Sequence, residues 1–338
     1  MSGFFCLSCL SGRRLFVVAV LCLFHVGHAA ADPLPSWQEG AGKAAILDFV
    51  AAVTTDGGPD FVPMAERIAV FDNDGTLWVE QPYYPQIQFA LDRVHSLAPE
   101  HPEWKSTQPF KAVLENDTGA LLAAGEKGLL ELIMATHAGT TTDEFAALMG
   151  DWISRARHRR FDRHFTELVY QPMLEVLKLL EDKGFQTFIV SGGGIEFVRP
   201  WAEPVYGLPP ERVIGSSIVT EFQMRDGKPV LVRLPRMDFI DDKAGKPVAI
   251  QKFIGRRPIA AFGNSDGDLQ MLQWATSGVG RRLGVIVRHD DKEREYGYDR
   301  DSRVGRLDQA LDAAGPAEWL VVSMRRDWGR VFSWEEAR

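Results

Sequence analysis

The sequence predicts an α/β protein with a doubly wound, Rossmann-like parallel sheet and an inserted helical cap. Short apolar runs alternate with helix-like segments after residue 160, whereas the pattern between residues 83 and 160 is helical throughout. Strands that alternate with helices form parallel sheets covered on both faces. We therefore expect a core built from residues 32–82 and 161–338 and a cap built from residues 83–160. With 338 residues, 45% of them apolar, the chain can bury a large core.

Residues 1–31 have the composition of a secretory signal peptide. Arg13 and Arg14 precede the apolar run LFVVAVLCLFHV, and small residues follow it, which predicts cleavage after Ala31, with cleavage after Ala30 as the alternative. The run is short for a bilayer span, so an uncleaved anchor is less favoured. The arginine pair also resembles a twin-arginine signal, which leaves both the Sec-type and the twin-arginine export routes open. We expect an exported protein, periplasmic or secreted.

The charge and the cysteines exclude several classes of function. Cys6, Cys9 and Cys22 all lie in the predicted signal peptide, so the mature protein is expected to have no disulfide framework, thiolate metal site or cysteine nucleophile. The formal net charge of −8 argues against general binding of nucleic acids or anionic membranes, which requires a basic surface. After signal cleavage we expect no stable membrane association.

Each expected element follows from a local pattern. Thr141 and Glu144 form a capping box that predicts the start of a helix, and Asp226-Gly227 is a strong hairpin signal between two strands within residues 212–234. Helical periodicity or a helix boundary signal predicts the other helices near residues 46–53, 86–98, 126–139, 173–183, 247–255, 269–275 and 306–314. Short apolar runs predict the other strands at residues 68–71, 185–190, 258–262, 284–287 and 319–324.

Three of the strands end in polar, glycine-bearing loops. These loops are Asp72-Asn73-Asp74-Gly75-Thr76, Ser191-Gly192-Gly193-Gly194 and Gly263-Asn264-Ser265-Asp266-Gly267-Asp268. Open α/β sheets bind their ligands at the carboxyl ends of the strands. If the sheet is parallel, the three loops meet at one edge, and that edge is the predicted site.

Several carboxylates could gather at this edge, and they would require a cation. Two unit charges 4 Å apart repel each other by about 4 kcal/mol at an effective dielectric constant of about 20. Oxygen ligands without His or Cys favour Mg²⁺, which shares its coordination shell with phosphate. The carboxylates are those of Asp72, Asp74, Asp266, Asp268 and Glu80.

The remaining polar groups of the loops suit a phosphate. The turn Ser191-Gly192-Gly193 offers a hydroxyl and backbone N–H groups, and Thr76 offers a second hydroxyl. Lys246 opens an apolar helix and could supply a fixed positive charge, with Lys243 as the less favoured alternative. A carboxylate nucleophile, a divalent metal, a lysine and an N–H cradle together indicate phosphoryl transfer.

In this order, FDNDGT, SGGG, Lys246 and GNSDGD resemble the four motifs of the haloacid dehalogenase-like (HAD) phosphohydrolases, and most closely their phosphoserine phosphatase branch. The resemblance covers roughly residues 66–290. It implies that Asp72 attacks phosphorus, that Asp74 acts as acid and base, and that Ser191 and Lys246 hold phosphoryl oxygens. Glu80 lies one position short of a glutamate that reads the substrate amine in that branch.

The fourth motif departs from the family pattern. Asn264 stands where the branch usually has the first Asp, whereas Asp268 is kept. An Asn carbonyl can ligate Mg²⁺ but carries no negative charge. Asp266 could compensate, directly or through water. The predicted metal ligands are therefore Asp72, Asp74, Asn264, Asp266 and Asp268.

The sequence thus predicts an exported, Mg²⁺-dependent phosphomonoesterase that hydrolyses small phosphate esters through an aspartyl-phosphate. Two alternatives stay open: a phosphotransferase or mutase with the same chemistry, and a non-catalytic exported binding or scaffold protein with a degenerate metal site. The sequence identifies neither the physiological substrate nor the oligomeric state.

Overall fold

The computed structural model describes residues 31–336. The predicted signal peptide, with its arginine pair and the three cysteines, lies outside the described residues except for Ala31. From Pro33 onward the chain forms one unit. In the described part of the chain, no helix is long and apolar enough to cross a membrane.

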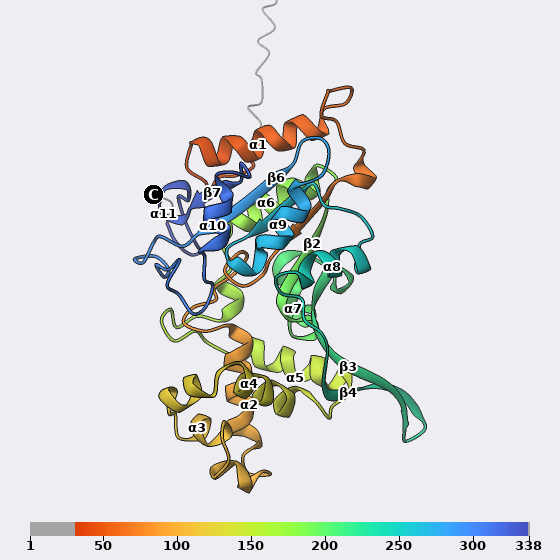
Figure 1. Cartoon of the computed structure of the whole chain (residues 1–338), viewed down its shortest axis with the longest axis vertical. Coiled ribbons are helices and arrows are strands. Elements are labelled where there is room, and N and C mark those ends of the chain that lie inside the picture. Colours follow the sequence, from red (N-terminus) through yellow and green to blue (C-terminus); the bar gives the residue numbers. More distant parts are fainter. Residues whose placement is uncertain (1–30, 337–338) are drawn as a thin grey trace, which may run out of the picture. The chain divides into compact units, whose positions relative to one another are not determined.

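In the described residues one seven-stranded sheet organises the fold, with the strand order β4-β3-β2-β1-β5-β6-β7 (Figure 1). The strands are β1 (Ile68–Phe71), β2 (Gln186–Gly194), β3 (Val213–Arg225), β4 (Lys228–Phe239), β5 (Ala260–Gly263), β6 (Leu283–Arg288) and β7 (Leu320–Ser323). Neighbouring strands are parallel except β3 and β4, which pair antiparallel. This confirms the predicted fold class. It also confirms the hairpin at Asp226-Gly227, where both residues have positive φ, as tight hairpin turns require.

The helices include all those that the sequence predicted. They are α1 (Ala41–Thr54), α2 (Pro85–Leu97), α3 (Phe110–Leu114), α4 (Thr118–His137), α5 (Thr142–Arg155), α6 (Gln171–Asp182), α7 (Ile195–Tyr206), α8 (Gly245–Phe253), α9 (Leu269–Thr276), α10 (Gln309–Ala314) and α11 (Met324–Asp327). The sequence pattern set no bounds for α7 and did not predict the short helices α3 and α11. Helix α4 begins eight residues before residue 126, where the sequence placed its start.

The stretch between β1 and β2 contains the helices α2 to α5, which Figure 1 shows grouped together. Helix α5 begins with the predicted capping box, in which Thr141 and Glu144 each bond the other's backbone N–H. Helices α2, α3 and α4 pack against one another through a small apolar cluster that includes Val94, Phe110 and Leu132. Helix α5 contacts α7, and α4 contacts β4, so this helical stretch lies next to the chain that follows β2.

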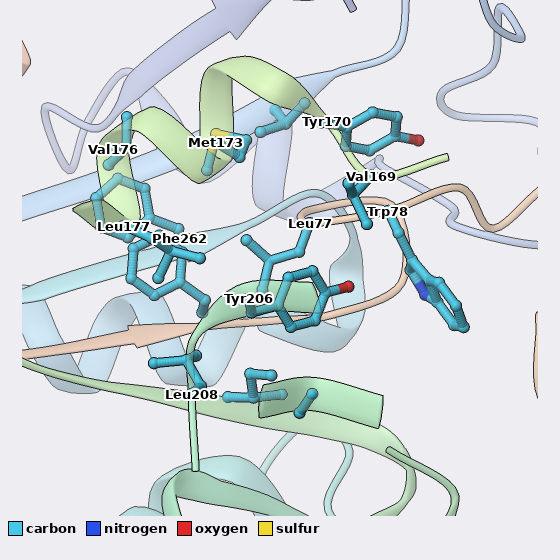
Figure 2. Packing of buried hydrophobic residues seen from close by; sticks show 14 of the residues in the cluster. Leu77, Trp78, Val169, Tyr170, Met173, Val176, Leu177, Tyr206, Leu208 and Phe262 are labelled. Carbon is cyan, nitrogen blue, oxygen red and sulfur yellow. The ribbon is translucent and has the colours of Figure 1, made fainter. Parts of the chain in front are cut away.

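Strand β1 lies in the centre of the sheet and is buried on both faces. Ala69 and Phe71 belong to the larger apolar cluster, and Ile68 and Val70 belong to the cluster on the other face. The ring of Phe71 stacks on Phe262 of β5, with ring centroids 4.2 Å apart. Figure 2 shows part of the larger cluster, into which the chain after β1 inserts Leu77 and Trp78. A central strand buried on both faces delivers Asp72 to the edge of the sheet in a fixed position.

Candidate active site

The first and fourth polar loops follow β1 and β5, whereas Ser191–Gly194, which the sequence predicted as a loop, forms the last four residues of β2. Strand β1 pairs with both β2 and β5, and all three run parallel. Their carboxyl ends therefore meet at one edge, as the sequence predicted. The backbone N–H of Asp72 still donates to Phe262 O at 2.9 Å, which continues the pairing of β1 with β5. The carbonyl of Asn73 then accepts the N–H groups of Thr76 and Leu77, and this closes a tight turn. Gly75 takes φ +76° in that turn, a conformation that favours glycine.

Lys246 links the first and fourth loops. Its Nζ donates to Oδ1 of Asp72 at 2.6 Å and to Oδ1 of Asp268 at 2.6 Å, and the lysine is only 2% exposed. Burial lowers the pKa of Lys246, but the carboxylates of Asp268, Asp72 and Asp241 outweigh burial and hold that pKa above its ordinary value. Lys243, the alternative lysine, is exposed.

The two carboxyl groups of the first loop have raised pKa values. For Asp72, burial and the neighbouring charge of Asp268 raise the pKa, against the opposing effect of Lys246. For Asp74, burial raises the pKa to about 6, although the indole Nε1 of Trp78 donates to its Oδ1 at 2.9 Å. A carboxyl group with a pKa near neutrality can both give and take a proton at physiological pH.

The structure places Asp268, a predicted metal ligand, in contact with Lys246 and with the backbone of its own loop. Its Oδ1 accepts from Lys246, and its Oδ2 accepts the backbone N–H groups of Asn264 and Ser265 at 3.0 and 3.1 Å. Both oxygens are thus engaged, and the residue is 0% exposed. In this arrangement Asp268 orients Lys246 and closes the fourth loop.

Asp266, another predicted metal ligand, contacts the start of helix α10. Its Oδ1 accepts the backbone N–H groups of Asp308 and Ala310 at 2.9 and 3.0 Å, which begin helix α10. Carboxylates commonly satisfy the unpaired N–H groups at helix starts. The structure therefore directs Oδ1 of Asp266 toward α10.

Asn264 joins Thr76 and Glu80 in a buried set of hydrogen bonds. The Thr76 hydroxyl donates to Asn264 Oδ1 at 3.1 Å, and Asn264 Nδ2 donates to Glu80 Oε1 at 2.6 Å. Thr76 is 0% and Glu80 2% exposed. The sequence predicted that both side chains contact the substrate. In the structure both side chains bond to Asn264, and their contact with the substrate stays a prediction.

Three polar side chains lie close to Gly193 in the glycine-rich segment. Ser191 Oγ accepts the Gly193 N–H at 3.0 Å, so this N–H of the predicted cradle is already used. A Cβ built on Gly193 would lie 3.2 Å from Ser191 Oγ, 3.3 Å from Gln86 Oε1 and 3.6 Å from Asp74 Oδ2. These three polar side chains, from three different elements, thus face one small space beside Gly193. A side chain at position 193 would fill it.

Gln86 is a site residue that sequence reasoning missed. It lies on α2, and its Oε1 accepts the Gly194 N–H at 2.8 Å, which connects the helical stretch to the glycine-rich loop. Its Nε2 lies 3.2 Å from His137 Nε2. Burial and the charges of Arg233 and Arg93 lower the pKa of His137 to about 3, so this histidine is neutral at physiological pH.

Two further polar residues near the site were missed. The Tyr298 hydroxyl donates to Glu80 Oε1 at 2.7 Å. Asp241 is 0% exposed, and neither of its carboxylate oxygens has a hydrogen-bond partner among the described residues. Burial raises the pKa of Asp241 to about 7. The only sequence signal for Asp241 was its position five residues before Lys246, in the segment Asp241-Asp242-Lys243.

The donor set of the site fits a hard divalent cation. Asp72, Asp74 and Asn264 offer carboxylate and amide oxygens, and burial raises the pKa of both carboxyl groups. Mg²⁺ binds through one or two carboxylates and keeps several waters, so it does not need a preformed cage. No group of three or more His, Cys, Asp or Glu residues in metal-binding geometry occurs in residues 31–336.

Comparison with known proteins identifies a family. The family model of the haloacid dehalogenase-like hydrolases matches residues 69–273, which include all four motifs. A search of curated proteins found no match. Similar solved structures include a protein of unknown function from Bordetella pertussis Tohama I, with 17% identity, a TM-score of 0.47 and coverage of 76% of this chain and 98% of that one.

Two other similar structures have names that include phosphoserine. One is a phosphoserine phosphohydrolase-like protein from Francisella tularensis subsp. tularensis SCHU S4, with 17% identity, a TM-score of 0.38 and coverage of 67% of this chain and 89% of that one. The other is a probable phosphoserine phosphatase from Vibrio cholerae, with 15% identity, a TM-score of 0.37 and coverage of 77% of this chain and 68% of that one. At these identities the likeness concerns the fold.

Proposed function

Because the chain belongs to the haloacid dehalogenase-like hydrolase family, we propose that it is an exported, Mg²⁺-dependent phosphomonoesterase that acts on small phosphate esters. The family is the one that the sequence predicted. The observation that carries the proposal is the position of Asp72, which lies 2.6 Å from Lys246 at the centre of three converging loops. Its neighbour Asp74 has a pKa of about 6, as an acid and base at neutral pH requires.

With Asp72 as nucleophile and Asp74 as acid and base, hydrolysis of the phosphate ester takes two steps. In the first, an oxygen of Asp72 forms a bond to phosphorus, the bond from phosphorus to the ester oxygen breaks, and Asp74 donates its proton to the departing alcohol. In the second, Asp74 takes a proton from water, whose oxygen attacks phosphorus and releases phosphate and the Asp72 carboxylate. Splitting one substitution into two in this way is the advantage of covalent catalysis.

Other groups hold the phosphoryl oxygens and neutralise charge. Lys246 compensates the charge of Asp72, and Ser191 Oγ faces the space beside Gly193 where the phosphoryl group would lie. Asp72, Asp74 and Asn264 would hold Mg²⁺, which neutralises charge on the phosphoryl oxygens when bound. Gln86 closes this space from the side of α2.

The expected cellular address supports the substrate class. The predicted signal peptide would place the enzyme outside the cytoplasm, where biosynthetic phosphorylated intermediates are not produced. An exported phosphatase is better suited to release phosphate from small esters that reach it from outside. A panel of about fifty phosphate esters tests this point, and activity on cytosolic biosynthetic intermediates alone would contradict it.

The proposed function is tested with p-nitrophenyl phosphate. The wild-type protein should hydrolyse it, EDTA should abolish the activity, and Mg²⁺ should restore it. Asp72→Asn should lower kcat by more than about 10³-fold without changing the circular dichroism spectrum. The control Asp56→Asn changes an exposed carboxylate in the same way and should leave kcat unchanged. Ordinary turnover by Asp72→Asn, or indifference to EDTA, would refute the proposal.

A further inference from the structure

The amide of Asn264 is held in one orientation by its two partners. Glu80 Oε1 lies 2.6 Å from Asn264 Nδ2, and the Thr76 hydroxyl lies 3.1 Å from Asn264 Oδ1. A carboxylate can only accept a hydrogen bond, so it selects the nitrogen of the amide. The carbonyl oxygen must then point away from Glu80. Because an amide oxygen has two lone pairs, it can accept the Thr76 hydroxyl and still ligate a cation.

Glu80 is itself fixed from several sides. The Tyr298 hydroxyl donates to the same Oε1 at 2.7 Å. A Cβ on Gly75 would lie 2.3 Å from Glu80 Oε1, and a Cβ on Gly305 would lie 1.8 Å from it. Both glycines have positive φ, at +76° and +63°. The backbone of two separate segments thus approaches the Glu80 carboxyl group as closely as only glycine permits.

The orientation of the amide does not depend on the charge of Glu80. Glu80 Oε1 accepts from both Asn264 Nδ2 and the Tyr298 hydroxyl, so this oxygen is an acceptor toward the amide. Burial raises the pKa of Glu80 well above its ordinary value, and the charges of Asp74 and Asp72 raise it further, against the hydrogen bond from Tyr298. A glutamine at this position could accept the same two hydrogen bonds through its carbonyl oxygen.

We propose that Glu80 is a positioning residue that fixes the Asn264 amide with its carbonyl oxygen directed to a cation bound by Asp72 and Asp74. The proposal rests on the proposed function, since it assumes that the site binds Mg²⁺. It has a further consequence that does not depend on the metal. Because Glu80 Oε1 accepts from Asn264 Nδ2 at 2.6 Å, a carboxyl group at position 264 would have no N–H for this contact and would either repel Glu80 or share a proton with it.

The pair is tested first without metal, by a double-mutant cycle of melting temperature in EDTA at pH 8. Asn264→Asp should lower the melting temperature by several degrees, because it places a second carboxylate against Glu80. Combining it with Glu80→Gln should restore most of that loss, since an amide and a carboxylate then face each other again. The exposed Asn116→Asp is the control and should change little. An equal loss from Asn264→Asp in both backgrounds would overturn the pairing.

The positioning role is tested with Mg²⁺ alone, by calorimetric titration of each folded variant. Glu80→Ala should weaken Mg²⁺ binding about 10- to 100-fold, the usual effect of losing a residue that orients a ligand. Glu80→Gln should stay within a few fold of wild type, because its carbonyl accepts the same N–H. At saturating Mg²⁺, KM for p-nitrophenyl phosphate should be unchanged in both variants.

The two levels of the proposal fail in distinguishable ways. Wild-type binding of Mg²⁺ combined with equally tight binding by Glu80→Ala would overturn the positioning role and leave the proposed function intact. Absence of Mg²⁺ binding in the wild type would overturn both. The melting-temperature cycle decides the pairing of Glu80 with Asn264 in either case.

Discussion

The side-chain nitrogen of Lys246 lies 2.6 Å from Oδ1 of Asp72, and both groups are almost completely buried. A buried ammonium group next to a carboxylate costs desolvation energy, which its electrostatic attraction has to offset. Here the lysine forms ion pairs with two carboxylates, because Lys246 Nζ also lies 2.6 Å from Asp268 Oδ1. This three-residue contact ties the helix α8 to the first and fourth loops and fixes the position of the proposed nucleophile.

Replacing Lys246 should therefore impair both stability and activity. Lys246→Met leaves two buried carboxylates without their cation and should lower the free energy of unfolding by about 3–5 kcal/mol. Urea unfolding measures this change, and p-nitrophenyl phosphate hydrolysis should fall below detection. The control is Lys243→Met, which removes an exposed lysine three residues away. Equal effects of the two substitutions would contradict the assignment of Lys246.

Gln86 should contribute to turnover although it lies outside the four motifs. Gln86→Ala removes the acceptor of the Gly194 N–H and one wall of the space beside Gly193, so kcat/KM should fall about tenfold, the value of one net hydrogen bond at the upper end of its range. Gln88→Ala is the matched control on the same helix, because Gln88 bonds to Tyr83 and Asp92 instead. Unchanged kinetics for Gln86→Ala would remove this residue from the site.

Asp241 should make stability depend on pH in a characteristic direction. Burial raises its folded-state pKa from 3.8 to about 7, so the folded state binds this proton more tightly than the unfolded state. Stability from this group is therefore fully present below about pH 4 and is lost as the pH rises to about 7. The loss is on the order of 4 kcal/mol at pH 8.

Asp241→Asn should remove this loss. We expect the variant to have a higher free energy of unfolding than wild type, and this gain should be larger at pH 8 than at pH 5. Urea unfolding in the presence of EDTA measures it. The control Asp242→Asn changes the partly exposed neighbouring carboxylate and should show no such pH-dependent gain. A gain for Asp241→Asn that is the same at both pH values would contradict the raised pKa.

The close approach of Gly305 to Glu80 predicts a difference between two glycine substitutions. Gly227→Ala, in the hairpin turn, meets no atom within 4 Å and should lose about 1–2 kcal/mol through its positive φ alone. Gly305→Ala carries the same backbone penalty and also places Cβ against Glu80, which should add about 1–3 kcal/mol. Thermal unfolding measures both changes. Equal losses would show that Glu80 moves away freely.

The sequence predicted the architecture well because that part of the information is local. Apolar runs and helical periodicity located the strands and most helices, and the alternation of these elements implied parallel pairing. The meeting of the loops after β1, β2 and β5 then followed from the topology alone. The same reasoning placed Lys246, at the start of an apolar helix, in reach of the first loop.

The partners of individual carboxylates could not be predicted, because they depend on contacts between distant segments. Glu80 meets Tyr298, which is 218 residues away, and Asp266 meets backbone N–H groups more than 40 residues away. A motif shows which acids are close in sequence, but it does not show which oxygens a lysine or a helix start already occupies. Gln86 carried no signal because a polar residue on an amphipathic helix is ordinary.

The central claim is that Asp72 becomes phosphorylated during turnover. An aspartyl-phosphate is an acyl phosphate, which borohydride reduces to homoserine, so the wild-type protein is quenched during turnover of p-nitrophenyl phosphate, reduced and analysed by peptide mass spectrometry. We expect homoserine at position 72, dependent on substrate and absent from Asp72→Asn. Active turnover with an unmodified Asp72, or with the modification at another residue, would contradict it.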